Sequence, residues 1–269
     1  MNDFKNKHGT WALVAGAAEG LGEAFSCALA GRKMNLLMLD NKPEPLSKLS
    51  SRLEEEFSIE TLQLNIDLQQ RDATALIMAE VKKYDCRLLI YNAAYSRVTP
   101  FLQLNENEFD LFIDINCRTP IKLVHSFAHH LMNFNSGGIL LMSSLSGLIG
   151  MQLVAPYAAT KAFNWNLAEG LHYELKEHNI NIMACVAGAT ATQAYLETNP
   201  EYGFFKPLVM EPKVVAEKAL ETLGKKTLFI PGFSNRMNYF ILTRLLPRKW
   251  ASALANMTMG KMYGEKLKT

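Results

Sequence analysis

The chain has 269 residues, of which 49% are hydrophobic and 20% are charged, and its net charge at pH 7 is +2. This balance argues against a disordered chain and against a strongly basic surface, so no nucleic-acid partner is expected. Four widely spaced cysteines and the lack of clustered histidines predict neither a disulfide framework nor a metal site. We expect one folded domain in the cytoplasm, because residues 1–8 are polar and no apolar run of about twenty residues follows.

Short apolar runs alternate with longer segments of helical periodicity, which is the pattern that βαβ units produce. The pattern predicts seven strands, at residues 10–15, 35–39, 61–65, 87–92, 138–142, 181–187 and 227–230. Between them lie helical segments with one apolar face, including two long ones at residues 106–131 and 156–178. The expected fold class is α/β, a single Rossmann-like domain built on a doubly wound parallel sheet of seven strands.

Gly16, Gly20 and Gly22 follow the first predicted strand with the spacing Gly-x-x-x-Gly-x-Gly. Small residues there permit a tight turn and a close approach of the backbone to a pyrophosphate, while the next helix presents free N–H groups. Asp40 ends the second predicted strand, where a carboxylate can accept hydrogen bonds from the adenine ribose and repel a 2′-phosphate. The pattern therefore favours NAD. NADP stays open, because Lys42 is close in sequence and Asp40 could instead be a solvated turn residue.

Tyr157 and Lys161 stand one helical turn apart, and Ser144 lies thirteen residues before the tyrosine. A tyrosine exchanges protons with an alcohol oxygen near neutral pH only if its pKa, about 10 in free form, is lowered. A lysine ammonium at i+4 lowers it. The same tetrad recurs at Tyr202 and Lys206, but without a serine thirteen residues upstream. We therefore expect a hydride-transfer enzyme in which the phenol of Tyr157 loses its proton early.

Five further markers accompany the glycines, namely Asn92, Asn116, Ser144, Tyr157 and Lys161. Together they resemble the short-chain dehydrogenase/reductase family over residues 10–192. The resemblance implies an oxidoreductase that transfers a hydride between a nicotinamide cofactor and an alcohol or carbonyl substrate. It implies that Tyr157 is the general acid or base, that Lys161 stabilises the phenolate, and that Ser144 donates a hydrogen bond to the oxyanion. Asn116 would hold a water that links the lysine to solvent.

The resemblance also implies a set of cofactor-binding residues: Gly16, Gly20, Leu21, Gly22, Asp40, Asp67, Leu68, Asn92, Ala93, Tyr157, Lys161, Gly188 and Thr192. Asp67 and Leu68 would hold the adenine, although Asp67 could equally belong to a helix N-cap. Asn92 would brace the central strands, Lys161 would also hold the nicotinamide ribose, and Thr192 would lie at the carboxamide. No metal is implied.

Three alanines depart from the family pattern, because Ala15, Ala94 and Ala187 replace the usual threonine, glycine and proline, and Tyr91 stands where an asparagine is usual. These departures motivate an alternative, a nucleotide-binding regulatory or membrane-surface protein that keeps the fold with little turnover. Since none of the four chemical residues is lost, we expect activity.

In this family the substrate is selected after the sixth strand, here at residues 188–212. This segment is rich in aromatic and apolar residues: Tyr195, Tyr202, Phe204, Phe205, Leu208 and Met210. The other wall would come from Tyr95, Val98, Phe101 and Leu102. An apolar small-molecule substrate is therefore favoured. The alternative, given equal weight, is that these residues only fill the core around a lid.

Beyond a catalytic domain at residues 1–231, a basic amphipathic helical extension is expected at residues 232–269. Its one acidic residue is Glu265, and its basic residues are Arg236, Arg244, Arg248, Lys249, Lys261, Lys266 and Lys268. We favour a role in covering the active-site mouth or a partner subunit over weak, peripheral contact with an anionic membrane. Family members commonly pair through the helices that hold Asn116 and Tyr157, so a homodimer or homotetramer is expected.

Overall fold

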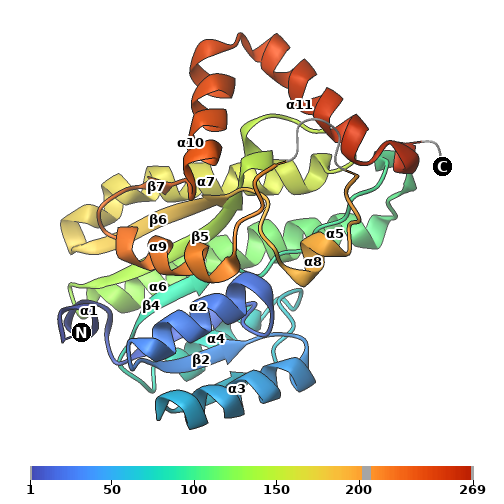
Figure 1. Ribbon diagram of the computed structural model, residues 1–269. Helices are drawn as coiled ribbons and strands as arrows, with labels where there is room; N and C mark the ends of the chain where they lie inside the picture. Colours follow the sequence, from blue (N-terminus) through green and yellow to red (C-terminus); the bar gives the residue numbers. More distant parts are fainter. Residues whose placement is uncertain (1, 202–206, 268–269) are drawn as a thin grey trace.

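A parallel sheet of seven strands forms the centre of the chain (Figure 1). The computed structural model describes residues 2–201 and 207–267. The strands are β1 (Trp11–Ala15), β2 (Asn35–Leu39), β3 (Thr61–Leu64), β4 (Cys86–Tyr91), β5 (Gly137–Ser144), β6 (Ile180–Ala187) and β7 (Leu228–Phe229). Their order is β3-β2-β1-β4-β5-β6-β7, and neighbouring strands are parallel. The predicted Rossmann-like α/β fold is confirmed.

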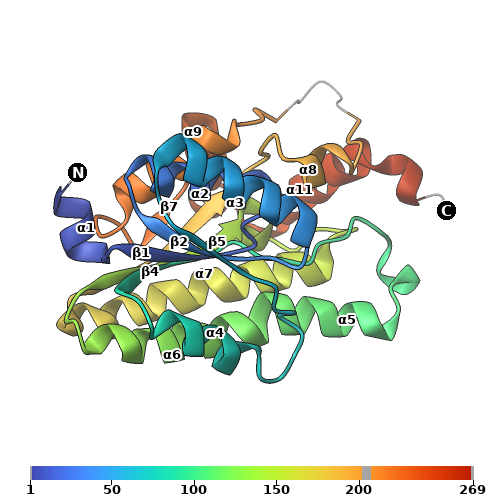
Figure 2. The same cartoon turned by 90° about the horizontal axis from the view of Figure 1, so that it is seen from below.

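The sheet is buried on both faces, which explains why its strands are continuous apolar runs. In β1, Ala12 and Val14 point into one core, whereas Leu13 and Ala15 point into the other. The first core lies under α2 (Gly20–Gly31), α3 (Pro43–Phe57) and α9 (Pro212–Thr222). The second lies under α4 (Ala73–Val81), α6 (Thr119–Met132) and α7 (Ala155–Leu175). Figure 2 shows these two helical layers on opposite sides of the sheet.

The strand order reverses between β1 and β4, so the chain leaves these two strands toward opposite faces. Ligands of open α/β sheets bind at such a switch point, outside the carboxyl ends of the strands. The glycine-rich turn follows β1, and Asn92 follows β4 directly. At the next strand, β5 runs two residues past the predicted end of 142 and carries Ser144 to the same edge. Topology therefore gathers the predicted site residues.

The long helix predicted at residues 106–131 is helical throughout but changes its winding. It consists of α5 (Glu106–Ile113), a π-helical turn (Asp114–Arg118) and α6. At its start Asn105 and Glu108 form a capping box, which explains the sharp beginning. The helix predicted at 156–178 is α7 followed by a 3₁₀ turn, Lys176–His178. The π turn was not predicted, because apolar periodicity does not reveal a single inserted residue.

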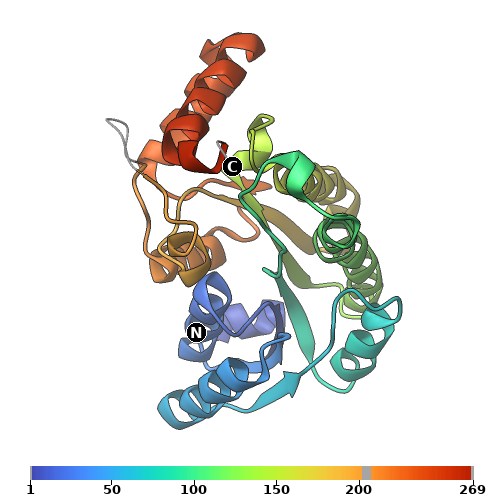
Figure 3. The same cartoon turned by 90° about the vertical axis from the view of Figure 1, so that its right-hand side faces the viewer.

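Several short or terminal elements complete the chain. They are α1 (Asn2–His8), α8 (Gln193–Leu196), α10 (Phe233–Phe240), a π turn (Ile241–Leu245), α11 (Arg248–Met262) and 3₁₀ turns at Phe101–Gln103, Leu145–Leu148 and Gly264–Leu267. We call residues 233–267 the C-terminal arm. Figure 3 shows its helices, in red, projecting past the sheet and its two layers. Within residues 2–201 and 207–267, no helix is both long and apolar enough to cross a bilayer.

Candidate active site

The glycine-rich turn packs so tightly that two of its glycines cannot carry a side chain. A Cβ on Gly22 would lie 1.7 Å from the carbonyl oxygen of Gly16, and a Cβ on Gly16 would lie 2.7 Å from the backbone of Ala93. Gly16 also has a φ of 77°, which favours glycine. Asn92 donates a hydrogen bond from Nδ2 to the Gly16 carbonyl at 2.9 Å, as expected of a brace. The turn is thus held against the end of β4.

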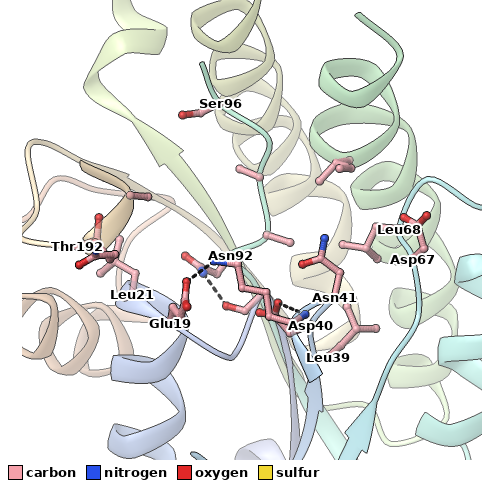
Figure 4. Close-up of a pocket in the computed structure, with 18 of the residues that line it drawn as sticks. Glu19, Leu21, Leu39, Asp40, Asn41, Asp67, Leu68, Asn92, Ser96 and Thr192 are labelled. Carbon is pink, nitrogen blue, oxygen red and sulfur yellow. Dashed lines mark hydrogen bonds and ion pairs between the residues drawn. The ribbon is translucent and has the colours of Figure 1, made fainter. Parts of the chain in front are cut away.

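A cavity of about 340 Å³ opens beside this turn (Figure 4). Ten of the predicted cofactor residues line it: Gly16, Gly20, Leu21, Asp40, Asp67, Leu68, Asn92, Ala93, Tyr157 and Thr192. Figure 4 shows Leu39, Asp40 and Asn41 at the end of β2, between Leu21 and Leu68 in this view. Lys161 and Gly188 line a neighbouring cavity instead, and Gly22 acts through its contact with Gly16. The groups present suit a dinucleotide laid across the strand ends.

The Asp40 carboxylate is held by the backbone of the two loops around it. Its Oδ2 accepts the N–H of Ala18 at 2.9 Å, and its Oδ1 accepts the N–H of Lys42 at 3.1 Å. Among the described residues that line the cavity, Lys42 alone is positively charged. Its ammonium lies 2.6 Å from a carboxylate oxygen of Glu19, and this hydrogen bond raises the pKa of Lys42. The part of the cavity around Asp40 is therefore acidic, and the one cation among its described lining residues is already paired.

Asp67 is not the helix N-cap that the sequence left open. The helix α4 begins at Ala73, and Asp72 occupies the N-cap position. Asp67 instead accepts the N–H of Gln69 at 2.9 Å, which makes a short turn and leaves Leu68 in the cavity wall. Both residues therefore line the cavity, and their role toward adenine stays a prediction.

A second cavity of about 400 Å³ joins the first, and the two share seven lining residues: Leu21, Asn92, Ala94, Ser96, Tyr157, Thr192 and Ala194. Ser144 and Lys161 line only the second. The phenol of Tyr157 therefore stands between a space suited to a cofactor and a space for another molecule. A group that passes a proton during hydride transfer has to reach both reactants, and this position allows it.

The helix α7 carries both Tyr157 and Lys161, with Pro156 in its first turn. The Lys161 ammonium lies 5.5 Å from the centre of the Tyr157 ring and donates a hydrogen bond to the carbonyl oxygen of Met142 at 2.9 Å. The neighbouring Ser143 donates its hydroxyl to the Lys161 carbonyl at 2.7 Å. Ser143 therefore fastens α7 to β5.

In the chain without a coenzyme, Tyr157 does not have the lowered pKa that its lysine neighbour was expected to produce. Burial raises the pKa of Tyr157 to about 12, although a hydrogen bond with Ser144 lowers it in part. Burial also lowers the pKa of Lys161 to about 8. Desolvation disfavours the charged form of each group, so it acts in opposite directions on an acid and a base. The phenol is therefore protonated at neutral pH and ready to donate a proton.

Asn116 lies in the π-helical turn and is fully buried. Its side-chain oxygen accepts the N–H of Tyr95 at 2.7 Å, and its Nδ2 donates to the Tyr95 carbonyl and to Thr160. Its own carbonyl accepts Nδ2 of Asn164 at 3.0 Å. Asn116 thus ties the loop after β4 to α7, next to the helical turn that presents the tyrosine and lysine. π turns are frequent at functional sites.

Only part of the predicted apolar lining faces the second cavity. Tyr195 and Val98 line it, whereas Leu208, Phe101 and Leu102 expose 62%, 56% and 94% of their surface. Tyr95 donates its hydroxyl to Glu108 instead. Tyr202, Phe204 and Phe205, together with the second tyrosine–lysine tetrad, lie outside the described residues.

Residues from the C-terminal arm that no motif indicated also line the second cavity, namely Asn235, Asn238, Met259, Met262 and Tyr263. The i, i+3 spacing of Met259 and Met262 in α11 is a signal that could have marked these two residues as a shared face.

A nucleotide cradle at the switch point, with a buried lysine and a serine around a tyrosine that faces a second cavity, defines an oxidoreductase that uses a nicotinamide cofactor. The family model for short chain dehydrogenase matches residues 10–203. The chain belongs to this family, so the resemblance and the prediction of a hydride-transferring enzyme are confirmed.

Three relatives show how far the similarity extends. The chain is 30% identical over 234 residues to a 7beta-hydroxysteroid dehydrogenase of Clostridium sardiniense. The matched region covers 87% of this chain and 90% of the relative. A structure described as giving insights into 7beta-hydroxysteroid dehydrogenase stereoselectivity has a TM-score of 0.86 at 23% identity and covers 94% of this chain and 98% of that one. A short-chain dehydrogenase from Sphingobium yanoikuyae in complex with NADPH has a TM-score of 0.78 at 23% identity and covers 90% and 95%.

Proposed function

We propose that the enzyme interconverts a bulky apolar secondary alcohol and its ketone, with NAD as the preferred cofactor. The single observation that carries this proposal is the position of Tyr157 at the junction of the two cavities. The apolar character of the second cavity supports the substrate class, since Met142, Met151 and Val154 are in its wall. The steroid named for the Clostridium sardiniense relative is a substrate of this kind.

In the reductive direction, Tyr157 donates its proton to the carbonyl oxygen as negative charge develops there. The Ser144 hydroxyl donates a hydrogen bond to the same oxygen. Lys161, while protonated, stabilises the phenolate that remains and holds the nicotinamide ribose. The bound nicotinamide supplies the hydride in reduction and accepts it in oxidation. Asn116 has acceptor capacity left on its side-chain and main-chain oxygens, through which it holds the water that returns a proton to the lysine.

The choice of NAD rests on charge at the adenine-ribose end. Asp40 and Glu19 both line this end, and Glu19 already neutralises Lys42. A 2′-phosphate would bring its negative charge against two carboxylates without an unpaired cation to receive it. Such juxtaposition of like charges selects against the wrong ligand.

A panel of ketones and secondary alcohols of increasing size, assayed with both nicotinamides by absorbance, tests the proposal. We expect turnover with apolar ketones and at least a tenfold higher kcat/KM with NADH than with NADPH, which corresponds to about 1.4 kcal/mol. Selectivity for NADPH would refute the role given to Asp40.

Asp40→Asn removes the negative charge while it keeps one acceptor oxygen for the backbone of Ala18. We expect the preference for NADH over NADPH to fall about tenfold, because repulsion of the 2′-phosphate is reduced. Glu19→Gln is the matched second change, since it frees Lys42 and should move the ratio in the same direction. An unchanged ratio in both variants would show that charge at this end does not select the cofactor.

We also propose that the enzyme forms a homodimer or homotetramer through the layer that holds α5, α6 and α7. Exposed apolar side chains on these helices support this, as Ile113, Ile121 and Tyr173 expose 55%, 42% and 72% of their surface. The free thiols of all four cysteines support a cytoplasmic location. Residues 1–231 would act as the catalytic domain and residues 232–269 as its extension.

One face of the arm lines the second cavity, in keeping with the covering role favoured by the sequence. For its outer face we propose weak contact with anionic membranes as the alternative to contact with a partner subunit. Exposed Phe240 and Trp250 lie among cations there, and the described part of the arm has Glu265 as its single acid. Trp250 is 67% exposed, whereas Trp11 is 7% exposed. Anionic vesicles should therefore shift the Trp250 emission to the blue, neutral vesicles should not, and Trp250→Phe should remove the shift. If protein dilution changes the emission and vesicles do not, the face contacts a second subunit instead.

A further inference from the structure

The last helix of the chain forms part of the wall of the substrate cavity. Met259, Met262 and Tyr263 line the same cavity as Tyr157. The i, i+3 spacing of the two methionines places them on one face of α11, and Tyr263 follows directly as the C-cap of this helix. Met257 lies on another face of this helix and is 49% exposed. The helix therefore has one side directed at the substrate space and another at solvent.

One clasp holds α11 to the loop that precedes α7. The side-chain oxygen of Asn256 accepts the N–H of Gln152 at 2.7 Å, and Gln152 donates from Nε2 to the Asn256 carbonyl at 2.8 Å. Asn256 also donates to the carbonyl of Gly150 at 3.1 Å. Gly260 permits this approach, because a Cβ there would lie 3.0 Å from Nε2 of Gln152.

A second clasp holds the end of α11 to the segment that follows α8. The N–H of Glu201 donates to the Met262 carbonyl at 2.9 Å, and the hydroxyls of Tyr263 and Thr198 are 2.9 Å apart. Thr198 itself lines the substrate cavity. The helix thus bridges two walls of the cavity that lie far apart in the sequence, and it is fixed at both.

We propose that α11 sets the size of substrate that the enzyme accepts, with Met259 and Met262 as specificity-determining residues and Asn256 as the residue that positions them. This inference rests on the proposed function, because it assigns the second cavity to the ketone or alcohol. Methionine is flexible and polarizable, so two of them fit the irregular outline of a bulky apolar group. The part of the substrate that they contact lies away from the reacting carbon, which Tyr157 has to reach. A larger side chain at either position shortens the cavity for a long substrate and leaves room for a short one.

The test compares kcat/KM for cyclohexanone and for a four-ring steroid ketone, with NADH. Met262→Trp should lower the ratio of steroid to cyclohexanone at least tenfold, which is the scale on which apolar pockets discriminate size. Met259→Ala should move the ratio in the opposite direction because it enlarges the cavity. Met257→Trp is the matched control, a large residue on the solvent-facing side of the same helix, and should leave the ratio within twofold.

Asn256→Ala tests the clasp separately. Loss of the contacts with Gln152 should raise KM for the steroid ketone several-fold and leave kcat with cyclohexanone unchanged, since the reacting groups are not touched. Equal effects of Met262→Trp and Met257→Trp on the ratio would overturn the inference, and so would equal losses with both ketones. Those outcomes would leave the proposed function intact. Failure of the wild-type enzyme to reduce either ketone would refute the proposed function and this inference together.

Discussion

Replacing Tyr157 with phenylalanine should lower kcat about 10²- to 10⁴-fold, the range that a general acid or base contributes. The substitution removes only the hydroxyl, so the cavity beside the glycine-rich turn keeps its shape. We expect NADH to bind with an affinity within a few-fold of the wild type, measured by the fluorescence of the bound nicotinamide. Loss of turnover with retained binding is the pattern of a residue that acts in the chemical step.

The same change on the same helix provides the control. Tyr173 is also part of α7 but is 72% exposed, so Tyr173→Phe should retain full activity. Turnover by Tyr157→Phe close to that of the wild type would contradict the mechanism. It would mean that another group donates the proton to the substrate.

Replacing Lys161 with methionine should reduce activity roughly 100-fold or more and yet stabilise the fold. Lys161 is 3% exposed, and burial lowers the pKa of its ammonium to about 8, below its ordinary value of 10.5. The folded chain therefore binds this proton more weakly than the unfolded chain, and the buried charge costs free energy at neutral pH. We expect the free energy of unfolding at pH 7 to rise by about 1 to 3 kcal/mol in Lys161→Met. The loss of the hydrogen bond to the Met142 carbonyl makes this gain smaller than the removal of the buried charge alone would give.

The sign of the effect is open to a pH test. Because the pKa of Lys161 is lowered by folding, the wild type should gain stability from this group as the pH rises from about 8 to 10.5. The difference between the two proteins in urea unfolding should therefore shrink over this window. Lys122→Met, a change at an exposed lysine on α6, should show no such dependence. A variant that is less stable than the wild type at pH 7 would show that Lys161 stabilises the fold as a cation.

The expected loss of activity and gain of stability in Lys161→Met place catalysis and stability in opposition at one residue. A lysine that must be charged to hold a phenolate is kept in a place where charge is disfavoured. The surrounding packing of α7 on β5, with Ser143 bonded to the Lys161 carbonyl, supplies the stability that the site itself lacks. Buried ionisable groups of this kind are typical of functional sites.

Much of the fold followed from residue pattern alone, because burial on both faces makes every central strand a continuous apolar run. The ends of the strands were predicted less accurately. β5 extends to Ser144 and β7 is only two residues long, since strand length depends on the neighbour with which each strand pairs. The π turn at Asn116 was also outside what periodicity predicts, because it depends on hydrogen bonds to Tyr95 and Thr160 from other elements.

The sequence by itself determined the chemistry available at the site. Spacing along a helix put Tyr157 and Lys161 on one face, and spacing along a turn put small residues where backbone meets backbone. Only the tertiary structure decided how those groups behave and what stands around them. The direction of the Tyr157 pKa depends on desolvation by packed neighbours, and it opposes the effect of the lysine that the sequence suggested. The contact between Gln152 and Asn256, which brings α11 to the substrate cavity, joins residues 104 positions apart. A periodic pattern describes neighbours within one element, whereas such a contact exists only once separate elements have packed.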